Sequence, residues 1–279
     1  MKWKRGPVSG DIEDRRGMRM GVGGGLGIGG AVIVLLLSLV FGQDLTGVFG
    51  AGPEQAPAAE QVEPVSETPE ERELVAFVSF VLDSAQSYWE RTFAANGIQY
   101  SRAKLVLFRD ATNTACGYGQ TASGPFYCPG DQKVYIDLSF FNDLDRRFGA
   151  PGDFAQAYVI AHEIGHHVQT LLGLDQRVRQ LQQSDPGSAN QYQVRMELQA
   201  DCLAGLFGNE MASMGILERG VVEEGLGAAS AVGDDRIQRQ TQGHVNPDAF
   251  THGSAAQRAE WFRRGLQSGR MQACDSFGG

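Results

Sequence analysis

The sequence predicts an α+β fold in which a small sheet is followed by a mostly helical C-terminal half. Residues 104–108, Lys-Leu-Val-Leu-Phe, are expected to form a strand, and residues 134–138 alternate apolar side chains with Tyr135 and Asp137, which is the period of a half-buried strand. From residue 153 onwards, apolar side chains recur with helical spacing. The length of 279 residues allows one or two domains. We expect one folded domain over residues 70–279, preceded by three N-terminal segments.

Residues 21–42 have the composition of a transmembrane helix. No charged residue occurs between Arg19 and Asp44, and an apolar run of about 20 residues can span a bilayer. The first 19 residues carry six Lys or Arg against three acids. Positive charge favours the cytoplasmic side, so residues 1–20 are expected in the cytoplasm and the bulk of the chain outside it.

The sequence of this N-terminal region is also compatible with other interpretations. A cleaved signal peptide would have an unusually long leading segment that contains three acids. The glycines of residues 21–29 have small-xxx-small spacing, which fits either self-association through the span or a Gly-rich entry to the membrane. Residues 43–69 are rich in Pro, Ala, Glu and Gln, so they are expected to form a disordered, acidic linker.

Local signals place the helices of the domain. A helix begins at Pro69, because Thr68 and Glu71 have the form of a capping box, and its apolar spacing continues to about residue 94. Turn-rich residues 124–130 separate the two strand-like segments. Later helices are expected over residues 153–172, over about 216–240, and over 254–268, where a second capping box begins the helix. A loop at 184–189 precedes one more helix, which extends to about residue 214.

The most informative motif is His-Glu-Ile-Gly-His at residues 162–166. Helical spacing puts His162 and His166 on one face, where both imidazoles can bind one metal ion, and Glu163 can reach a water on that ion. His167 points about 100° away from His166 and is not expected as a ligand. The alternative is an amphipathic helix with two surface histidines. Against it, the flanking sequence is apolar on most turns, and three of the five histidines of the chain lie here.

A second motif, Glu-Leu-Gln-Ala-Asp at residues 197–201, completes the expected ligand set. A catalytic zinc site has three protein ligands and one open position for water. Glu197 can supply the third ligand from a second helix. Asp201, one turn later on the same face, is placed to accept a hydrogen bond from a ligand histidine. The sequence therefore predicts one zinc ion bound by His162, His166 and Glu197.

The paired motifs resemble those of the gluzincin metallopeptidases, and the wider sequence resembles a bacterial family of neutral zinc metallopeptidases with one membrane anchor. The matching stretches are Glu13-Asp-Arg-Arg-Gly, Gly124-Pro-Phe-Tyr-Cys-Pro, Val134-Tyr-Ile-Asp-Leu-Ser-Phe-Phe, Ala161-His-Glu-Ile-Gly-His-His-Val-Gln, Glu197-Leu-Gln-Ala-Asp-Cys, Gly233-Asp-Asp and Thr251-His-Gly-Ser. They cover essentially the whole chain apart from residues 43–70. The resemblance implies a zincin-like domain and a membrane-anchored zinc metalloendopeptidase that hydrolyses peptide or protein substrates, with Glu163 as general base.

The same resemblance implies two further features. His252, followed by Arg258 just before a helix, is similar to a His-Pro…Arg segment in which the histidine contacts the transition state, although Gly253 replaces the proline here. We expect this role for His252, with Arg258 supporting the ligands; the alternative is a structural loop histidine. The strand before the motif helix is commonly the sheet edge that binds an extended substrate, so residues 133–141 are expected there, with an internal strand as the alternative.

Four cysteines occur, at positions 116, 128, 202 and 274. No Cys-x-x-Cys is present, so a structural zinc knuckle is not expected. An even number in an externally facing domain favours disulfides. Cys116–Cys128 is the natural local pair, which leaves Cys202–Cys274 to tie the C-terminal tail to the Glu197 helix. Four buried free thiols are the alternative.

Two other classes of function are compatible with the motifs. The first is a non-proteolytic, membrane-anchored zinc protein that acts as a binding module; the presence of Glu163 disfavours it, because a structural metal does not need that carboxylate. The second is a zinc hydrolase of another amide, such as one in the cell wall, but no wall-binding repeat is recognisable. The net charge of −9 makes nucleic acid an unexpected partner.

Overall fold

The structure is a computed structural model that describes residues 1–18, 65–121, 124–218 and 220–278. One folded unit comprises Met1–Arg16 and Ser66–Gly279, and a second, Gly17–Val65, lies almost entirely outside the described residues. The segment 21–42, expected to span a membrane, and most of the linker expected over 43–69 lie in that second unit. No helix among the described residues is long and apolar enough to cross a membrane.

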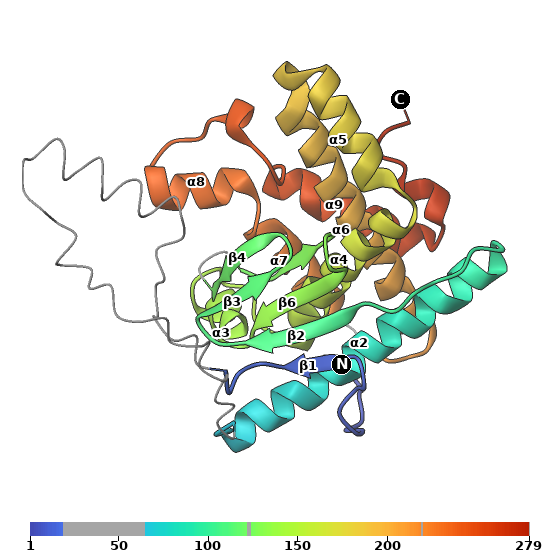
Figure 1. Cartoon of the computed structure of the whole chain (residues 1–279), viewed down its shortest axis with the longest axis vertical. Coiled ribbons are helices and arrows are strands. Elements are labelled where there is room, and N and C mark those ends of the chain that lie inside the picture. The colour runs from blue at the N-terminus through green and yellow to red at the C-terminus, as the bar shows by residue number, and fades with distance from the viewer. Residues whose placement is uncertain (19–64, 122–123, 219, 279) are drawn as a thin grey trace, which may run out of the picture. The chain divides into compact units, whose positions relative to one another are not determined.

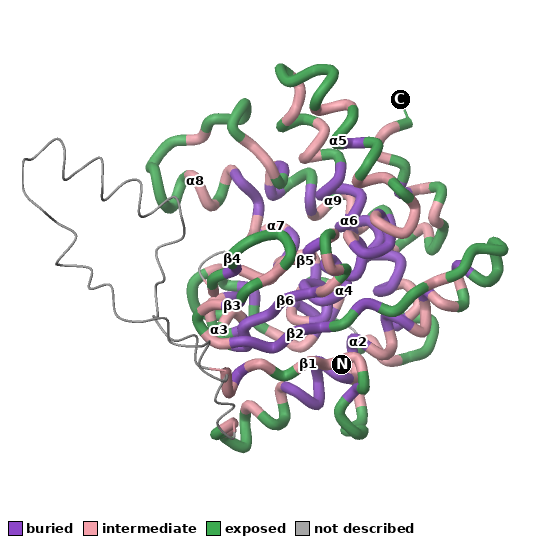
Figure 2. Tube along the Cα trace, viewed as in Figure 1, coloured by how far each residue is buried: buried purple, intermediate pink, exposed green. Residues whose placement is uncertain are grey.

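A four-stranded sheet with the strand order β1-β2-β6-β5 lies within the first unit; β1, β2 and β6 are labelled in Figure 1, and β5 in Figure 2. β1 (Ile12–Asp14) and β6 (Lys133–Asp137) each run parallel to β2 (Lys104–Phe108), whereas β5 (Phe126–Cys128) runs antiparallel to β6. β3 (Ala111–Thr114) and β4 (Gly117–Gln120) form a separate antiparallel hairpin. The expected α+β class is therefore present, with a mixed sheet.

The helical part of the fold follows the sheet in sequence. The helices are α2 (Pro69–Ala95), α3 (Ser139–Arg146), α4 (Asp153–Leu171), α5 (Leu174–Ser184), α6 (Ala189–Ser213), α7 (Val222–Ala231), α8 (Asp234–Gln242) and α9 (Ala255–Ser268), with 3-10 turns at Pro186–Ser188, Pro247–Ala249 and Met271–Cys274. Both predicted capping boxes are present, at the starts of α2 and α9. The helix expected over 216–240 is instead divided into α7 and α8, and α3 and α5 are additional.

The two central strands of the sheet, β2 and β6, are buried on both faces over most of their length (Figure 2). In β2, Leu105 and Leu107 belong to the main core, which also contains side chains of α2, α4, α6, α7 and α9. Val106 and Phe108 belong to a smaller cluster with Cys128 and Tyr135. Successive side chains of a strand point to opposite faces, so this alternation fixes the register of β2 between two apolar layers.

The strand before the motif helix is internal rather than at the edge of the sheet. β6 pairs with β2 on one side and with β5 on the other, which corrects the expectation for residues 133–141. The chain leaves the strand at Asp137, whose Oδ1 accepts a hydrogen bond from the Ser139 backbone at 2.9 Å, and α3 begins there. β5 is therefore the terminal strand of the sheet on this side.

Two disulfides join parts of the unit, and both match the predicted pairing. Cys116–Cys128 links the β3–β4 hairpin region to β5, with the two Cα atoms 5.8 Å apart. Cys202–Cys274 links α6 to the C-terminal turn, with the Cα atoms 5.4 Å apart. All four cysteines of the sequence are used, so no thiol is free.

The N-terminal residues are part of this folded unit. Ile12, Glu13 and Asp14 pair with residues 105–107 of β2, and Lys133 of β6 donates to Glu13 across 2.7 Å. Two neighbouring strands of one sheet must lie on the same side of a membrane. A single membrane crossing within residues 21–42 would place β1 and β2 on opposite sides of the membrane. A cytoplasmic location of residues 1–20 with the rest of the domain outside is therefore incompatible with the pairing of β1 and β2.

We predict that the N-terminus and the helical half face the same compartment. The protein has no free thiol, so one introduced cysteine is a unique label: Gly6→Cys, where no atom lies within 4 Å of a Cβ, or Gln183→Cys on the exposed surface of α5. In spheroplasts of a bacterial host, a membrane-impermeant maleimide should label both variants to the same extent.

The single-crossing topology makes the opposite prediction for this experiment. It requires Gln183→Cys to react in intact spheroplasts and Gly6→Cys to react only after permeabilisation. That result would contradict the pairing of β1 with β2 in the cell.

Candidate metal centre

The helices that carry the two motifs, α4 and α6, approach closely at Gly165. A Cβ at this position would lie 3.1 Å from the backbone oxygen of Ala200 and 3.2 Å from its Cα. That is tighter than ordinary van der Waals contact, so the absence of a side chain permits the approach. Gly165 lies between the two motif histidines, and Ala200 lies between Glu197 and Asp201. The contact therefore brings the two motifs face to face.

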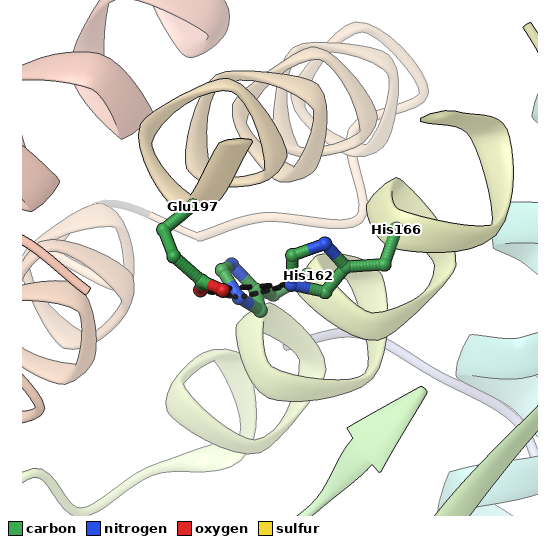
Figure 3. A group of neighbouring side chains, drawn as sticks. All are labelled: His162, His166 and Glu197. Carbon is green, nitrogen blue, oxygen red and sulfur yellow. Dashed lines mark hydrogen bonds and ion pairs between the residues drawn. The ribbon is translucent and has the colours of Figure 1, made fainter. Parts of the chain in front are cut away.

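The three predicted ligands converge between these helices (Figure 3). His162 Nε2 lies 3.2 Å from His166 Nε2 and 3.2 Å from Glu197 Oε2, and His166 Nε2 lies 3.6 Å from the same oxygen. His162 and Glu197 are buried, and His166 is 18% exposed at its side chain.

This geometry fits a zinc ion. Zinc–nitrogen bonds of about 2.0–2.1 Å at tetrahedral angles place two ligand nitrogens roughly 3.3 Å apart, close to the separation of the two imidazoles. Two imidazole nitrogens and one carboxylate oxygen are also a donor set typical of catalytic zinc, which keeps a fourth position for water. His162, His166 and Glu197 are thus able to hold the metal without rearrangement of the helices.

A buried polar cluster fixes the orientation of His162. Its Nδ1 lies 2.8 Å from Asp201 Oδ1, which leaves Nε2 free to face the other ligands. Arg258 of α9 donates to both oxygens of Asp201, at 2.8 and 2.9 Å, and the Tyr158 hydroxyl donates to Oδ1 at 2.5 Å. The structure therefore places Asp201 and Arg258 directly behind a ligand histidine.

His166 is oriented by a residue that the sequence motif does not contain. Its Nδ1 lies 2.9 Å from Gln169 Oε1, and the Gln169 amide donates to the Met196 carbonyl of α6 at 2.8 Å. Gln169 is three residues after His166, and Tyr158 is four before His162, so both lie on the ligand face of α4. This helical spacing is the signal that would have identified them.

The charges of the site favour a cation at the ligand atoms. Burial by itself lowers the pKa of His162, but Asp201 and Glu197 outweigh it and raise that pKa to about 9. Burial raises the pKa of Glu197, yet the two histidines hold it well below its usual range. A proton and a metal ion therefore compete for the same position, and metal binding releases protons.

The ligands lie in a cleft of about 920 Å³, which also contains the two predicted catalytic residues. Glu163 is 7% exposed; burial raises the pKa of its carboxyl, although the adjacent His162 and His166 oppose this. His252 lines the same cleft, and half of its side chain is exposed. The walls include Phe126 and Tyr127 of β5, so the terminal strand of the sheet contributes to the same cleft as the ligands.

The remaining histidines have structural positions. His167 is fully buried on another face of α4, where its Nε2 donates to the Ser101 carbonyl at 2.6 Å and its Nδ1 accepts from Tyr127 at 3.1 Å. Burial lowers the pKa of His167, consistent with a neutral ring in this tautomer. His244 is exposed and bonds to the Gln242 carbonyl.

Comparison with known proteins agrees with the metal centre. The family described as "Putative neutral zinc metallopeptidase" matches residues 1–277. The "Uncharacterized protein YpfJ" of Escherichia coli K12 is 47% identical over 288 residues, covering 100% of this chain and 99% of that protein. The "Uncharacterized protein Rv2575" of Mycobacterium tuberculosis is 46% identical over 189 residues, covering 64% of this chain and 63% of its own. No solved structure matches the chain.

We predict that Glu197 and Asp201 contribute differently to zinc binding. Glu197→Gln removes a charged ligand, so zinc affinity should fall by far more than the ~10- to 100-fold typical of a lost orienting partner. Asp201→Asn should stay within that ~10- to 100-fold range. It also leaves Arg258 buried without its partner charge, so the metal-free protein should lose about 3 to 5 kcal/mol of unfolding free energy.

Zinc affinity is measured by competition with a chelator, and unfolding by denaturant titration in EDTA. The control is Glu210→Gln, which is the same substitution on α6 at a partly exposed residue paired with Arg91, and it should change neither quantity appreciably. Equal losses of zinc affinity for Glu197→Gln and Asp201→Asn would show that both acids bind the metal directly.

Proposed function

Because this chain belongs to the family of neutral zinc metallopeptidases, we propose that it is a zinc-dependent endopeptidase with a zincin-like catalytic domain. The observation that carries the proposal is the convergence of His162, His166 and Glu197 beside Glu163, inside a cleft large enough for a peptide. A metal with a structural role alone needs no buried carboxylate in addition to its ligands. Glu163 therefore favours hydrolysis over a binding module.

In this proposal Glu163 transfers the proton. When bound, zinc lowers the pKa of a coordinated water towards roughly 7 and polarises the scissile carbonyl. Glu163 follows His162 directly on α4 and accepts the proton of the attacking water. It then delivers that proton to the nitrogen of the leaving amine. Its burial supports this role, since a raised carboxyl pKa makes both steps accessible near neutral pH.

The substrate is proposed to bind in extended form along β5. This strand is the last in the order of the sheet, and its residues Phe126 and Tyr127 line the cleft. Pairing of an extended peptide with a sheet edge is a general mode of recognition that requires little from the peptide sequence. The apolar walls of the cleft, which include Phe140, Phe148 and Val159, would then accept apolar side chains of the substrate.

His252 is proposed to stabilise the negative charge that develops on the carbonyl oxygen. It lines the same cleft as the ligands and is half exposed, so a substrate can reach its imidazole. A positioned donor of this kind typically contributes about 3 kcal/mol to the rate of acyl transfer.

We also propose that this domain works outside the cytoplasm, at a membrane surface. Its two disulfides are typical of an oxidising compartment, and the apolar composition of residues 21–42 favours association with lipid. Since β1 and β2 share a sheet, the proposal places residues 1–16 in the same external compartment as the rest of the domain.

The test is cleavage of a peptide library by the full-length protein and by Glu163→Gln. The variant should retain zinc, because all three ligands remain, while turnover falls by about 10²- to 10⁴-fold. The control is Asp153→Asn, a half-exposed residue at the start of the same helix, which should keep its activity. A zinc-loaded wild type that cleaves no peptide would overturn the proposal in favour of a binding protein, and unchanged activity of Glu163→Gln would exclude its role as base.

A further inference from the structure

The loop that carries His252 is held by one buried carboxylate. Asp234, the first residue of α8, is 8% exposed. Its Oδ2 accepts hydrogen bonds from the backbone N–H groups of Thr251, His252 and Gly253, at 2.7, 2.6 and 3.1 Å. The Asp234 N–H donates in return to the Gly253 carbonyl at 2.9 Å. These contacts fix three successive residues of the loop against the start of α8.

The second oxygen of the same carboxylate reaches the imidazole. Asp234 Oδ1 lies 3.2 Å from His252 Nδ1, and the Thr251 hydroxyl lies 3.0 Å from that nitrogen. An imidazole that donates from Nδ1 presents Nε2 on its other side. His252 lines the ligand cleft, so Nε2 is the nitrogen available to a group bound there.

We propose that Asp234 is a positioning residue for His252: it holds a proton on Nδ1, stabilises the doubly protonated ring and directs its Nε2–H as a donor towards the substrate. The proposal deepens the proposed function, on which it depends for the role of Nε2 in catalysis. It also explains why the sequence contains Gly233-Asp-Asp and Thr251-His-Gly-Ser as separate motifs, since the first binds the second.

The charges around His252 agree with this assignment. The hydrogen bond to Asp234 is the main cause of the raised pKa of His252; burial opposes it, Glu197 of α6 adds to it, and Arg258 of α9 works against it. A raised histidine pKa means that a larger fraction of the imidazole is protonated at neutral pH. Because Asp234 holds one proton on Nδ1, the doubly protonated ring is the form that also carries an N–H at Nε2, and this N–H can donate to a developing oxyanion.

The neighbouring acid, Asp235, provides a matched control. Its Oδ1 accepts a hydrogen bond from the Ala255 N–H at 2.7 Å, which satisfies one free donor at the start of α9. Asp235 thus binds the backbone next to the loop but is not bonded to His252. Asp234→Asn and Asp235→Asn remove one charge each from adjacent positions, and only the first removes the charge next to the imidazole.

The experiment follows His252 by NMR in the full-length, zinc-loaded protein with labelled histidine, and His252→Gln assigns its signal among the five histidines. Asp234→Asn keeps an oxygen acceptor for the loop but loses the negative charge, so the pKa of His252 should fall. The alkaline limb of the activity profile should shift to lower pH, and kcat should fall about 10- to 100-fold, the range for a lost orienting partner, with a smaller change in KM. Asp235→Asn should leave the pKa of His252 and kcat close to the wild type.

A double substitution separates positioning from a purely structural role. If Asp234 acts through His252, Asp234→Asn should cost little further activity in a His252→Gln background. An unchanged His252 pKa in Asp234→Asn, or a full additional loss of kcat in that background, would overturn the proposal. If the wild type cleaves no peptide, the proposed function fails and the catalytic role of Nε2 with it, while the NMR titration still decides whether Asp234 holds the imidazole.

Discussion

The close approach of α4 and α6 at Gly165 is the constraint on which the metal centre depends. With the Ala200 backbone oxygen 3.1 Å from where a Cβ would be, a side chain at Gly165 would require the two helices to shift by a few tenths of an ångström. Zinc–ligand distances vary by only about 0.2 Å, so a shift of this size between the helices would disturb the placement of Glu197 relative to an ion held by the histidines. The metal centre is therefore a consequence of helix packing as much as of ligand identity.

The second support of the site is the buried pair of Asp201 and Arg258. Burial of two charges is costly, and a pair of this kind is retained where its geometry satisfies additional hydrogen bonds. Here the pair joins α6 to α9 and also binds Tyr158 and His162 of α4. The same helices approach closely at Gly205 and Gly265, where a Cβ on Gly265 would lie 2.0 Å from the Cys202 carbonyl oxygen. Three helices thus meet at one carboxylate, whose position determines the orientation of a ligand.

Features that depend on short sequence spacing could be predicted, and most of those that depend on distant pairing could not; the exception is Cys202–Cys274, the pair that remained once Cys116 had been assigned to its local partner. The i,i+4 histidines, the Glu-x-x-x-Asp turn and both capping boxes are local patterns whose geometry follows from one helix. In contrast, the pairing of β1 with β2 joins residues about 90 positions apart, and nothing local in Ile12–Asp14 indicates its partner. The edge position of β5 and the link from Asp234 to His252 are equally non-local. Gln169 is a different case, because its helical spacing from His166 was visible in the sequence.

The central claim is that α4 and α6 together bind one zinc ion through His162, His166 and Glu197. The most direct test is a crystal structure of the zinc-loaded protein with anomalous diffraction measured at the zinc absorption edge. We expect one anomalous peak, within bonding distance of Nε2 of His162, Nε2 of His166 and a carboxylate oxygen of Glu197. A peak bound by Asp201 in place of Glu197, or no peak between the two helices, would contradict the account.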